Sequence, residues 1–130
     1  MEVMVAFVVM AIGFMSMLYL ALFVVRVNTT SRHMGTARFI AERHAEHLRS
    51  VDYRHPLLTS EKTTPDLDDL ENPDHEETIV HNNIPYNILW NIAANVPHDD
   101  TKTVRIHVLW LEQGEQKHFQ TTTIKGAVRR

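Results

Sequence analysis

The stretch from Val3 to Val25 decides the fold. It reads VMVAFVVMAIGFMSMLYLALFVV and contains no charged residue. A helix rises about 1.5 Å per residue, so roughly 20 apolar residues cross a hydrocarbon core of about 30 Å. The whole chain has 130 residues, 22% of them charged, and a net charge of −3. These averages resemble those of a soluble protein only because the sequence outside this stretch is very polar.

Two other interpretations of the apolar stretch are weaker. A cleaved secretory signal starts with basic residues and has an apolar core of about 7–15 residues before a small-residue cleavage site. No Lys or Arg precedes this stretch, and no such site follows it. A buried core helix would need more apolar sequence around it than the chain supplies. We therefore expect residues 1–25 to form a transmembrane helix, which excludes a plain cytosolic globule, a disordered chain and, without cysteine, a disulfide-rich mini-protein.

The polar sequence that follows is expected to continue the same helix through residues 26–52. This segment contains no proline, and Pro56 follows soon after it as a stop signal. Small or apolar residues recur every seven positions, which is typical of an amphipathic helix. The two rows of this pattern are Val27, Met34, Ala41 and Leu48, and then Thr30, Ala37, His44 and Val51.

Three residues of the expected helix stand out. Glu2 places a carboxylate at the edge of the apolar span, which is costly unless the group is neutralised, paired or kept in the hydrated interface. A solvated position and a functional pairing both remain open for Glu2. Gly13 and Gly35 are weak points where the helix could bend or locally unwind.

Residues 53–83 are expected to form an acidic variable loop. The stretch Glu61–Glu77 reads EKTTPDLDDLENPDHEE, with eight acids against Lys62. Acids at positions 66, 68, 69 and 71 offer oxygen ligands for calcium, but the glycine and terminal glutamate of an EF-hand loop are missing. A solvated surface loop is therefore the favoured interpretation.

The C-terminal part, residues 84–130, is expected to form a small antiparallel sheet. Apolar residues alternate in residues 84–93 and 103–112, as in strands with one buried face, and a third strand is expected near 117–125. Gln113-Gly114-Glu115 is suited to a hairpin turn. The only available cover for the apolar face is the helix stripe. The expected fold class is therefore α+β, with one long N-terminal helix packed on this sheet.

No pattern in the chain indicates catalysis. There is no nucleophile elbow, phosphate-binding loop or paired-carboxylate motif, so we expect neither an enzyme nor a cofactor. His44-Ala-Glu-His47 puts two histidines on one helix face, but a zinc site needs three or four ligands, and we expect no metal site. Trp90 and Trp110 are expected in the core rather than stacked on a ligand, and nothing indicates a nucleic-acid partner.

The start of the chain, with Glu2 followed by VMVAFVVMAIG, resembles the type IV pilin and type II secretion pseudopilin superfamily, most closely the PilV-type minor pilins. Ala37–Tyr53 and Tyr86–Trp110 are similar to that group as well. The resemblance implies a non-enzymatic subunit that joins a filament or primes its assembly. It also implies that Glu2 faces the N-terminal amine of a neighbouring subunit. The implied partners are other pilin or pseudopilin subunits through the helix, an inner-membrane assembly platform, and membrane lipid before assembly.

The orientation of the chain in the membrane depends on the charges that flank the apolar stretch. Arg26, Arg32 and Arg38 follow the apolar stretch, which by the positive-inside rule places the head in the cytoplasm. Precursors in the family carry a short basic leader that ends in glycine, whereas Met1 stands directly before Glu2 here. A misassigned start, a truncated chain and a chain that is not processed are the alternatives, and we expect a slightly longer encoded precursor. With a basic leader, we expect the chain to span the bacterial inner membrane once with its head in the periplasm. The head would later lie on a filament or at the cell surface.

Two other functions compete with filament assembly. The first is a single-pass anchored binding protein with a cytoplasmic head, whose arginine-rich segment 26–54 lies near anionic lipid. The second is a membrane protein that binds a metal or small molecule through its nine histidines. The pattern does not distinguish a pilus from a secretion or DNA-uptake system.

Overall fold

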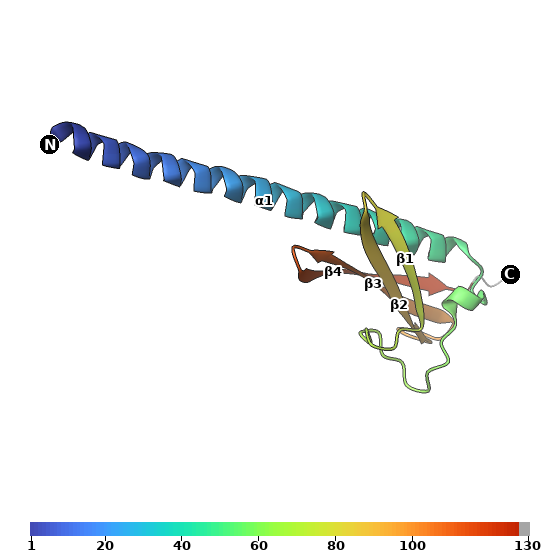
Figure 1. Cartoon of the computed structure of the whole chain (residues 1–130). Coiled ribbons are helices and arrows are strands. Elements are labelled where there is room, and N and C mark those ends of the chain that lie inside the picture. Colours follow the sequence, from blue (N-terminus) through green and yellow to red (C-terminus); the bar gives the residue numbers. More distant parts are fainter. Residues whose placement is uncertain (128–130) are drawn as a thin grey trace. The chain divides into compact units, whose positions relative to one another are not determined.

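The computed structural model describes residues 1–127 and has the expected α+β architecture (Figure 1). Its elements are helix α1 (Glu2–Ser50), the 3-10 helix η1 (Pro56–Leu58), and strands β1 (His75–His81), β2 (Ile84–Ala94), β3 (Thr101–Glu112) and β4 (Glu115–Gly126). The chain divides into two compact units, Met1–Met34 and the part from Gly35 onward, which we call the head. Helix α1 contributes residues to both units.

Helix α1 ends two residues before the expected boundary at residue 52. In the last turn the His47 carbonyl accepts two hydrogen bonds, one from Ser50 Oγ at 2.7 Å and one from the backbone N–H of Val51 at 3.3 Å. His47 and Arg49 lie in that turn, where positive charge is favourable. The helix is continuous through Gly13 and Gly35, so a bend at either residue stays a prediction.

The buried stripe of α1 begins at Ala37. Ala37 and Ala41 have no exposed surface, and such small side chains let the helix backbone approach the sheet closely. The other buried residues of α1 are Ile40, His44, Ala45 and Leu48. The seven-residue pattern is therefore confirmed in the head, whereas Val27 and Met34, which belong to the same pattern, are exposed.

The sheet has the strand order β1-β2-β3-β4, and every neighbouring pair is antiparallel. Two-residue turns join the outer pairs. Asn82 and Asn83 have φ of 50° and 63°, and Gln113 and Gly114 have φ of 51° and 80°. Two consecutive residues with positive φ are typical of the type I′ turn, whose twist matches that of a hairpin. The expected turn at Gln113-Gly114 is confirmed, and β4 begins at once with Glu115.

Strand β1 lies inside the segment 53–83, which the sequence predicted to be a loop throughout. It pairs with β2 in a register that places His75 opposite Trp90 and Ile79 opposite Tyr86. Six of its seven residues are exposed, so its sequence HEETIVH shows no alternation between apolar and polar residues. The prediction was wrong here because an edge strand with two exposed faces has no pattern of burial to reveal it.

The core lies between the head part of α1 and one face of the sheet, which we call the inner face. It contains the expected alternating residues of β2 and β3, namely Tyr86, Ile88, Trp90, Ile92, Val104, Ile106, Val108 and Trp110. Leu58 of η1 belongs to the same core and has no exposed surface. Trp90 Nε1 donates a hydrogen bond to the Leu57 carbonyl at 3.0 Å, which gives this buried indole the partner it needs.

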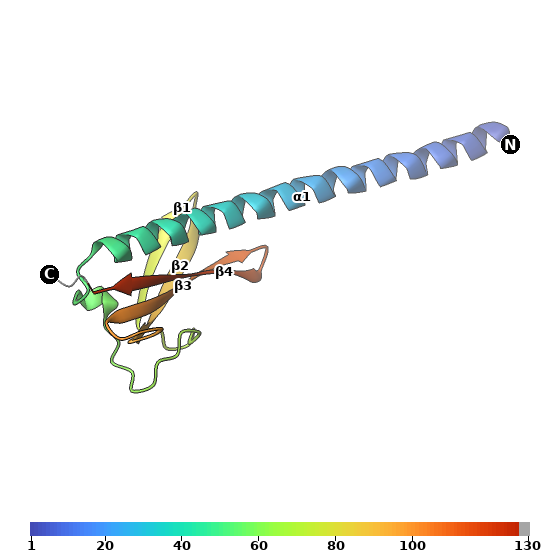
Figure 2. The same cartoon turned by 180° about the vertical axis from the view of Figure 1, so that it is seen from behind.

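The opposite face of the sheet, the outer face, is covered in part by the segment between η1 and β1. Figures 1 and 2 show this segment on the side of the sheet away from the head part of α1. Leu89, Asn91, His107 and Leu109 point to this face and are buried. The sequence predicted a solvated loop here, but the loop backbone is bound to the sheet, since Asn91 Nδ2 donates to the carbonyls of Leu67 and Asp69.

Candidate functional site

The first candidate site is the surface of the apolar part of α1. Every residue from Met1 to Val27 is exposed, including Phe7, with 75% of its surface exposed, and Leu18, with 56%. Within the described residues, α1 is the one helix long and apolar enough to cross a membrane. So large an apolar surface indicates contact with lipid or with other apolar helices.

Polar side chains in and next to this apolar part are bonded within the helix. Ser16 Oγ donates to the Ile12 carbonyl at 2.9 Å, and Thr29 Oγ1 donates to the Val25 carbonyl at 3.0 Å. A hydroxyl in a bilayer core has no water to bond, so a partner within its own helix lowers the cost of burial. The polar residues of this segment therefore do not argue against a membrane or a helix bundle.

Glu2, the predicted assembly residue, is the first residue of α1 and is exposed. Among residues 1–127, its carboxylate has no hydrogen bond or ion pair. Its position in the first turn is favourable because the helix N-terminus carries partial positive charge. If this end of the helix enters an apolar environment, a partner for the carboxylate has to come from outside this part of the chain.

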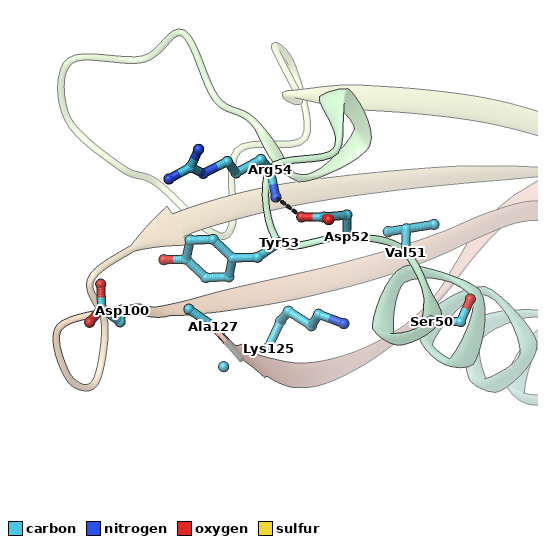
Figure 3. A pocket seen from close by; sticks show the side chains of 9 residues that line it. Ser50, Val51, Asp52, Tyr53, Arg54, Asp100, Lys125 and Ala127 are labelled. Carbon is cyan, nitrogen blue, oxygen red and sulfur yellow. Dashed lines mark hydrogen bonds between the residues drawn. The ribbon is translucent and has the colours of Figure 1, made fainter. Parts of the chain in front are cut away.

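A second candidate is an open hollow of about 820 Å³ where α1 ends (Figure 3). It is lined by Ser50, Val51, Asp52, Tyr53, Arg54, Asp100, Lys125, Gly126 and Ala127. Asp52 Oδ1 accepts the backbone N–H of Arg54 at 3.0 Å, and Lys125 Nζ donates to the Arg49 carbonyl. The Asp52 carboxylate and the Lys125 ammonium are thus bound to the protein's own backbone. Within residues 1–127, these two groups do not converge on a shared position for a ligand.

The segment 53–58 next to this hollow is attached through Lys102. Lys102 Nζ donates to the carbonyls of Tyr53 and Leu58 at 2.9 and 2.8 Å, and it lies 4.4 Å from the centre of the Tyr53 ring. Burial lowers the pKa of this ammonium group. Lys102 is therefore a structural attachment between β3 and the segment that follows α1.

The histidines of the H-x-x-H pattern are not arranged as metal ligands. His44 is buried with its ring centre 4.4 Å from that of Trp90, whereas His47 is exposed and its ring centre lies 6.4 Å from that of His44. Among residues 1–127, no group of three or more His, Asp or Glu side chains could hold a metal ion. Burial lowers the pKa of His44, nearby Glu77 raises it, and His47 lowers it again.

Two of the four acids considered as calcium ligands are bound to cationic side chains of the protein itself. Asp68 accepts two hydrogen bonds from Arg105 Nη1, at 2.7 and 2.8 Å, and this contact lowers the pKa of the carboxyl group. Asp69 accepts one from Lys62 Nζ at 2.9 Å, which lowers its pKa in the same way. These carboxylates point to different cations, so the structure gives no support to a shared calcium site.

Asn91 of β2 is the main anchor of the acidic loop, which we define as Glu61–Asp74. It has no exposed surface. Its Nδ2 donates to the carbonyls of Leu67 and Asp69, at 3.2 and 2.7 Å. Its Oδ1 accepts the backbone N–H of Asp74 at 2.9 Å. One buried amide thus satisfies three backbone groups of the loop.

His107 of β3 is the second anchor. Its Nε2 lies 2.8 Å from the Leu67 carbonyl, and its Nδ1 lies 2.9 Å from Nε2 of His118 on β4. His107 has 1% of its surface exposed. The alternation of apolar residues in 84–93 and 103–112 leaves Asn91 and His107 on the face opposite the core, where the sequence indicates no role for them. The one sequence feature that could have revealed these anchors is that polar side chains alternate with core residues in both strands. Ordinary solvated residues show the same alternation, so it does not identify an anchor.

Comparison with known proteins identifies no relative of this chain. No family model, no curated protein and no solved structure matches it.

Proposed function

We propose that this protein is a non-enzymatic minor pilin or pseudopilin that joins a type IV pilus-like filament or primes its assembly. The observation that carries the proposal is the position of Glu2 at the start of a helix whose apolar side chains are exposed on all sides. A head in which the last part of such a helix packs on an antiparallel sheet agrees with this function. The family is proposed on the resemblance of residues 2–13.

The physical role of Glu2 follows from the surroundings that the helix would have in a filament. Side chains of neighbouring helices would cover the apolar surface and exclude water from it. A carboxylate in such a bundle is costly unless a positive group pairs with it, and the N-terminal amine of a neighbouring subunit supplies one. Because the pair forms only at one axial position, it also sets the register between subunits.

Before assembly, the same apolar helix would hold the subunit in the membrane. We propose a single-pass protein of the bacterial inner membrane, with its head in the periplasm and later on the filament or the cell surface. Its partners are then other pilin or pseudopilin subunits, bound through α1, and the inner-membrane assembly platform. In this proposal the membrane and the filament core are alternative covers for one apolar surface.

Glu2→Ala tests the assembly role in cells that build the filament. The amount of the variant in the sheared filament fraction should fall at least about tenfold, while its amount in the membrane stays normal, because one buried charge pair is worth more than 1.4 kcal/mol. Glu61→Ala is the matched control, since it removes an exposed acid of the loop and should leave incorporation unchanged. Normal incorporation of Glu2→Ala would remove the role proposed for Glu2.

A second function is favoured by a specific observation, the three arginines at positions 26, 32 and 38. Basic residues next to a span stay on the cytoplasmic side, which would make the protein an anchored binding protein with a cytoplasmic head. Fusions of a reporter to the C-terminus, one active only in the periplasm and one active only in the cytoplasm, separate the two functions. A cytoplasmic head would exclude the filament subunit, and a periplasmic head would exclude the alternative.

A further inference from the structure

Two histidines, His107 and His118, meet on the outer face of the sheet. The ring centres of His107 and His118 are 5.1 Å apart, and the ring planes differ by 23°. Nδ1 of His107 and Nε2 of His118 are 2.9 Å apart. The distance between the ring centres is longer by about two ring radii, which is the value expected when both nitrogens lie on the line that joins the centres. The two nitrogens therefore face each other nearly in the planes of their rings, as an N–H···N hydrogen bond requires.

The positions of the protons follow from the partners. The Leu67 carbonyl can only accept, so the hydrogen of neutral His107 is assigned to Nε2, 2.8 Å away. Nδ1 of His107 is then an acceptor, and His118 Nε2 donates to it. One added proton keeps this hydrogen bond and makes it charge-assisted. Two added protons put a hydrogen on both facing nitrogens, which abolishes the bond and sets two positive charges against each other.

A metal ion between the rings explains the geometry less well. Two nitrogens bound to a tetrahedral zinc ion at about 2.0–2.1 Å would lie about 3.3 Å apart and would not face each other directly. The described residues also supply no third ligand at this position. A shared hydrogen therefore accounts for the contact between His107 and His118.

The charged groups around the pair come from three elements. The acidic loop supplies Asp68, whose carboxylate lies 4.0 Å from His107 Nε2. Strand β3 supplies Arg105, which binds that carboxylate and offsets its charge. In the cross-strand row of His107, β2 contributes the apolar Leu89, and Glu76 of β1 lies beyond it. One partly neutralised acid thus faces the pair, which is enough to accept a first positive charge but does not balance two.

We propose that His107 and His118 form a proton-operated clamp, which holds the acidic loop on the sheet while the pair carries at most one positive charge. When both rings are charged, repulsion from His118 displaces His107 from the Leu67 carbonyl. The loop then keeps its contacts with Asn91 and Arg105 but loses the one with His107, which weakens its closure over the sheet. Opening exposes the His107 side chain, which has 1% of its surface exposed while the loop is closed.

The direction of the pH effect follows from proton binding. Loss of hydration and the neighbouring His107 lower the pKa of His118, while Asp68 raises it in part. The facing nitrogens are 2.9 Å apart, so the closed pair accepts at most one added proton, whereas the open pair can accept two. The open loop therefore binds more protons than the closed loop. Closure is fully favoured above the ordinary histidine pKa of about 6.5 and is lost progressively as the pH falls below that value.

Hydrogen exchange of the full-length chain in detergent micelles tests the clamp. After correction for intrinsic exchange, the protection of peptides within residues 61–74 should fall about fivefold between about pH 7.5 and about pH 5, because the lost hydrogen bond to the Leu67 carbonyl is worth about 1 kcal/mol. His118→Gln retains an amide opposite His107 but cannot become charged, so the loop should stay protected at both pH values. His118 is exposed, and this variant should fold normally.

His81→Gln is the matched control, since His81 is an exposed histidine on β1. This variant should show the pH dependence of the unmodified chain. Equal protection of the loop at both pH values in the unmodified chain would overturn the clamp. The same loss of protection in His118→Gln would overturn it too, because the charge on His118 would then have no part in opening.

Discussion

The backbone N–H of Asp74 donates a hydrogen bond to Oδ1 of Asn91 at 2.9 Å. The Asp74 carboxylate continues the contact, since its Oδ2 accepts the backbone N–H of Ile92 at 2.8 Å. The loop thus leaves the sheet surface at a point where both its backbone and its side chain are bound to β2.

Asn91→Ala is expected to detach the acidic loop. It removes three hydrogen bonds to the loop backbone, each worth about 1 kcal/mol, and leaves the Asp69 carbonyl and the Asp74 N–H without these partners, so the free energy of unfolding should fall by about 2–3 kcal/mol. Denaturation of the full chain in micelles measures this loss. Asn87→Ala is the control because Asn87 lies on the same strand, is exposed and bonds one side chain, Thr78. Equal losses for the two variants would contradict the anchor role.

Ala41→Leu is expected to separate α1 from the sheet. Ala41 has no exposed surface, and a larger side chain in a close-packed contact costs about 1–3 kcal/mol. Thermal unfolding followed by tryptophan fluorescence measures the effect, since Trp90 and Trp110 lie in the same core. Phe39→Leu, on an exposed part of the helix, should change stability by less than about 0.5 kcal/mol. An unchanged Ala41→Leu variant would mean that the helix does not pack closely here.

His44→Leu is expected to reduce the loss of stability in acid. Burial lowers the pKa of His44, so the unfolded chain binds its proton more readily, and the stability from this group is lost as the pH falls below about 6.5. Nε2 of His44 has no hydrogen-bond partner in the described part of the chain, so an apolar replacement should be tolerated at pH 7.5.

Unfolding in urea at about pH 7.5 and about pH 5 checks this expectation. His44→Leu should match the unmodified chain at the higher pH and exceed it in stability at the lower one. The control is His98→Gln, at an exposed histidine in the turn between β2 and β3. A variant that loses as much stability in acid as the unmodified chain would show that His44 does not titrate as argued.

The double variant Phe14→Arg/Leu18→Arg is expected to prevent stable membrane insertion. Both side chains are exposed on the apolar part of α1, and each arginine near the middle of a span costs about 3 kcal/mol. Extraction of membranes at alkaline pH should release the variant and leave the unmodified chain in the pellet. Phe14→Leu/Leu18→Ala, which changes the same positions without charge, should stay in the pellet. Retention of the arginine variant would contradict a membrane-spanning role.

The amphipathic part of the helix and strands β2 and β3 could be predicted because the spacing of their apolar residues shows which side chains are buried. The seven-residue pattern located the buried Ala37, Ala41 and Leu48, and alternation located the inner faces of β2 and β3. The same reasoning missed β1, whose residues face water on both sides and whose structure depends on pairing with β2. It identified Glu2 as an exception in the apolar helix, and the role of Glu2 stays a prediction, since its carboxylate has no partner among residues 1–127.

The sequence by itself determined the long apolar helix, its amphipathic continuation and the inner face of the sheet. Each depends on residues within a few positions of one another, so the spacing of side chains is enough to reveal it. Only the tertiary structure decided that the acidic loop lies on the outer face and that His107 meets His118. These contacts join groups far apart in the chain, as in the hydrogen bond between Asn91 and the Leu67 carbonyl. A buried polar anchor has the same local pattern as a solvated residue, so only the fold distinguishes the two.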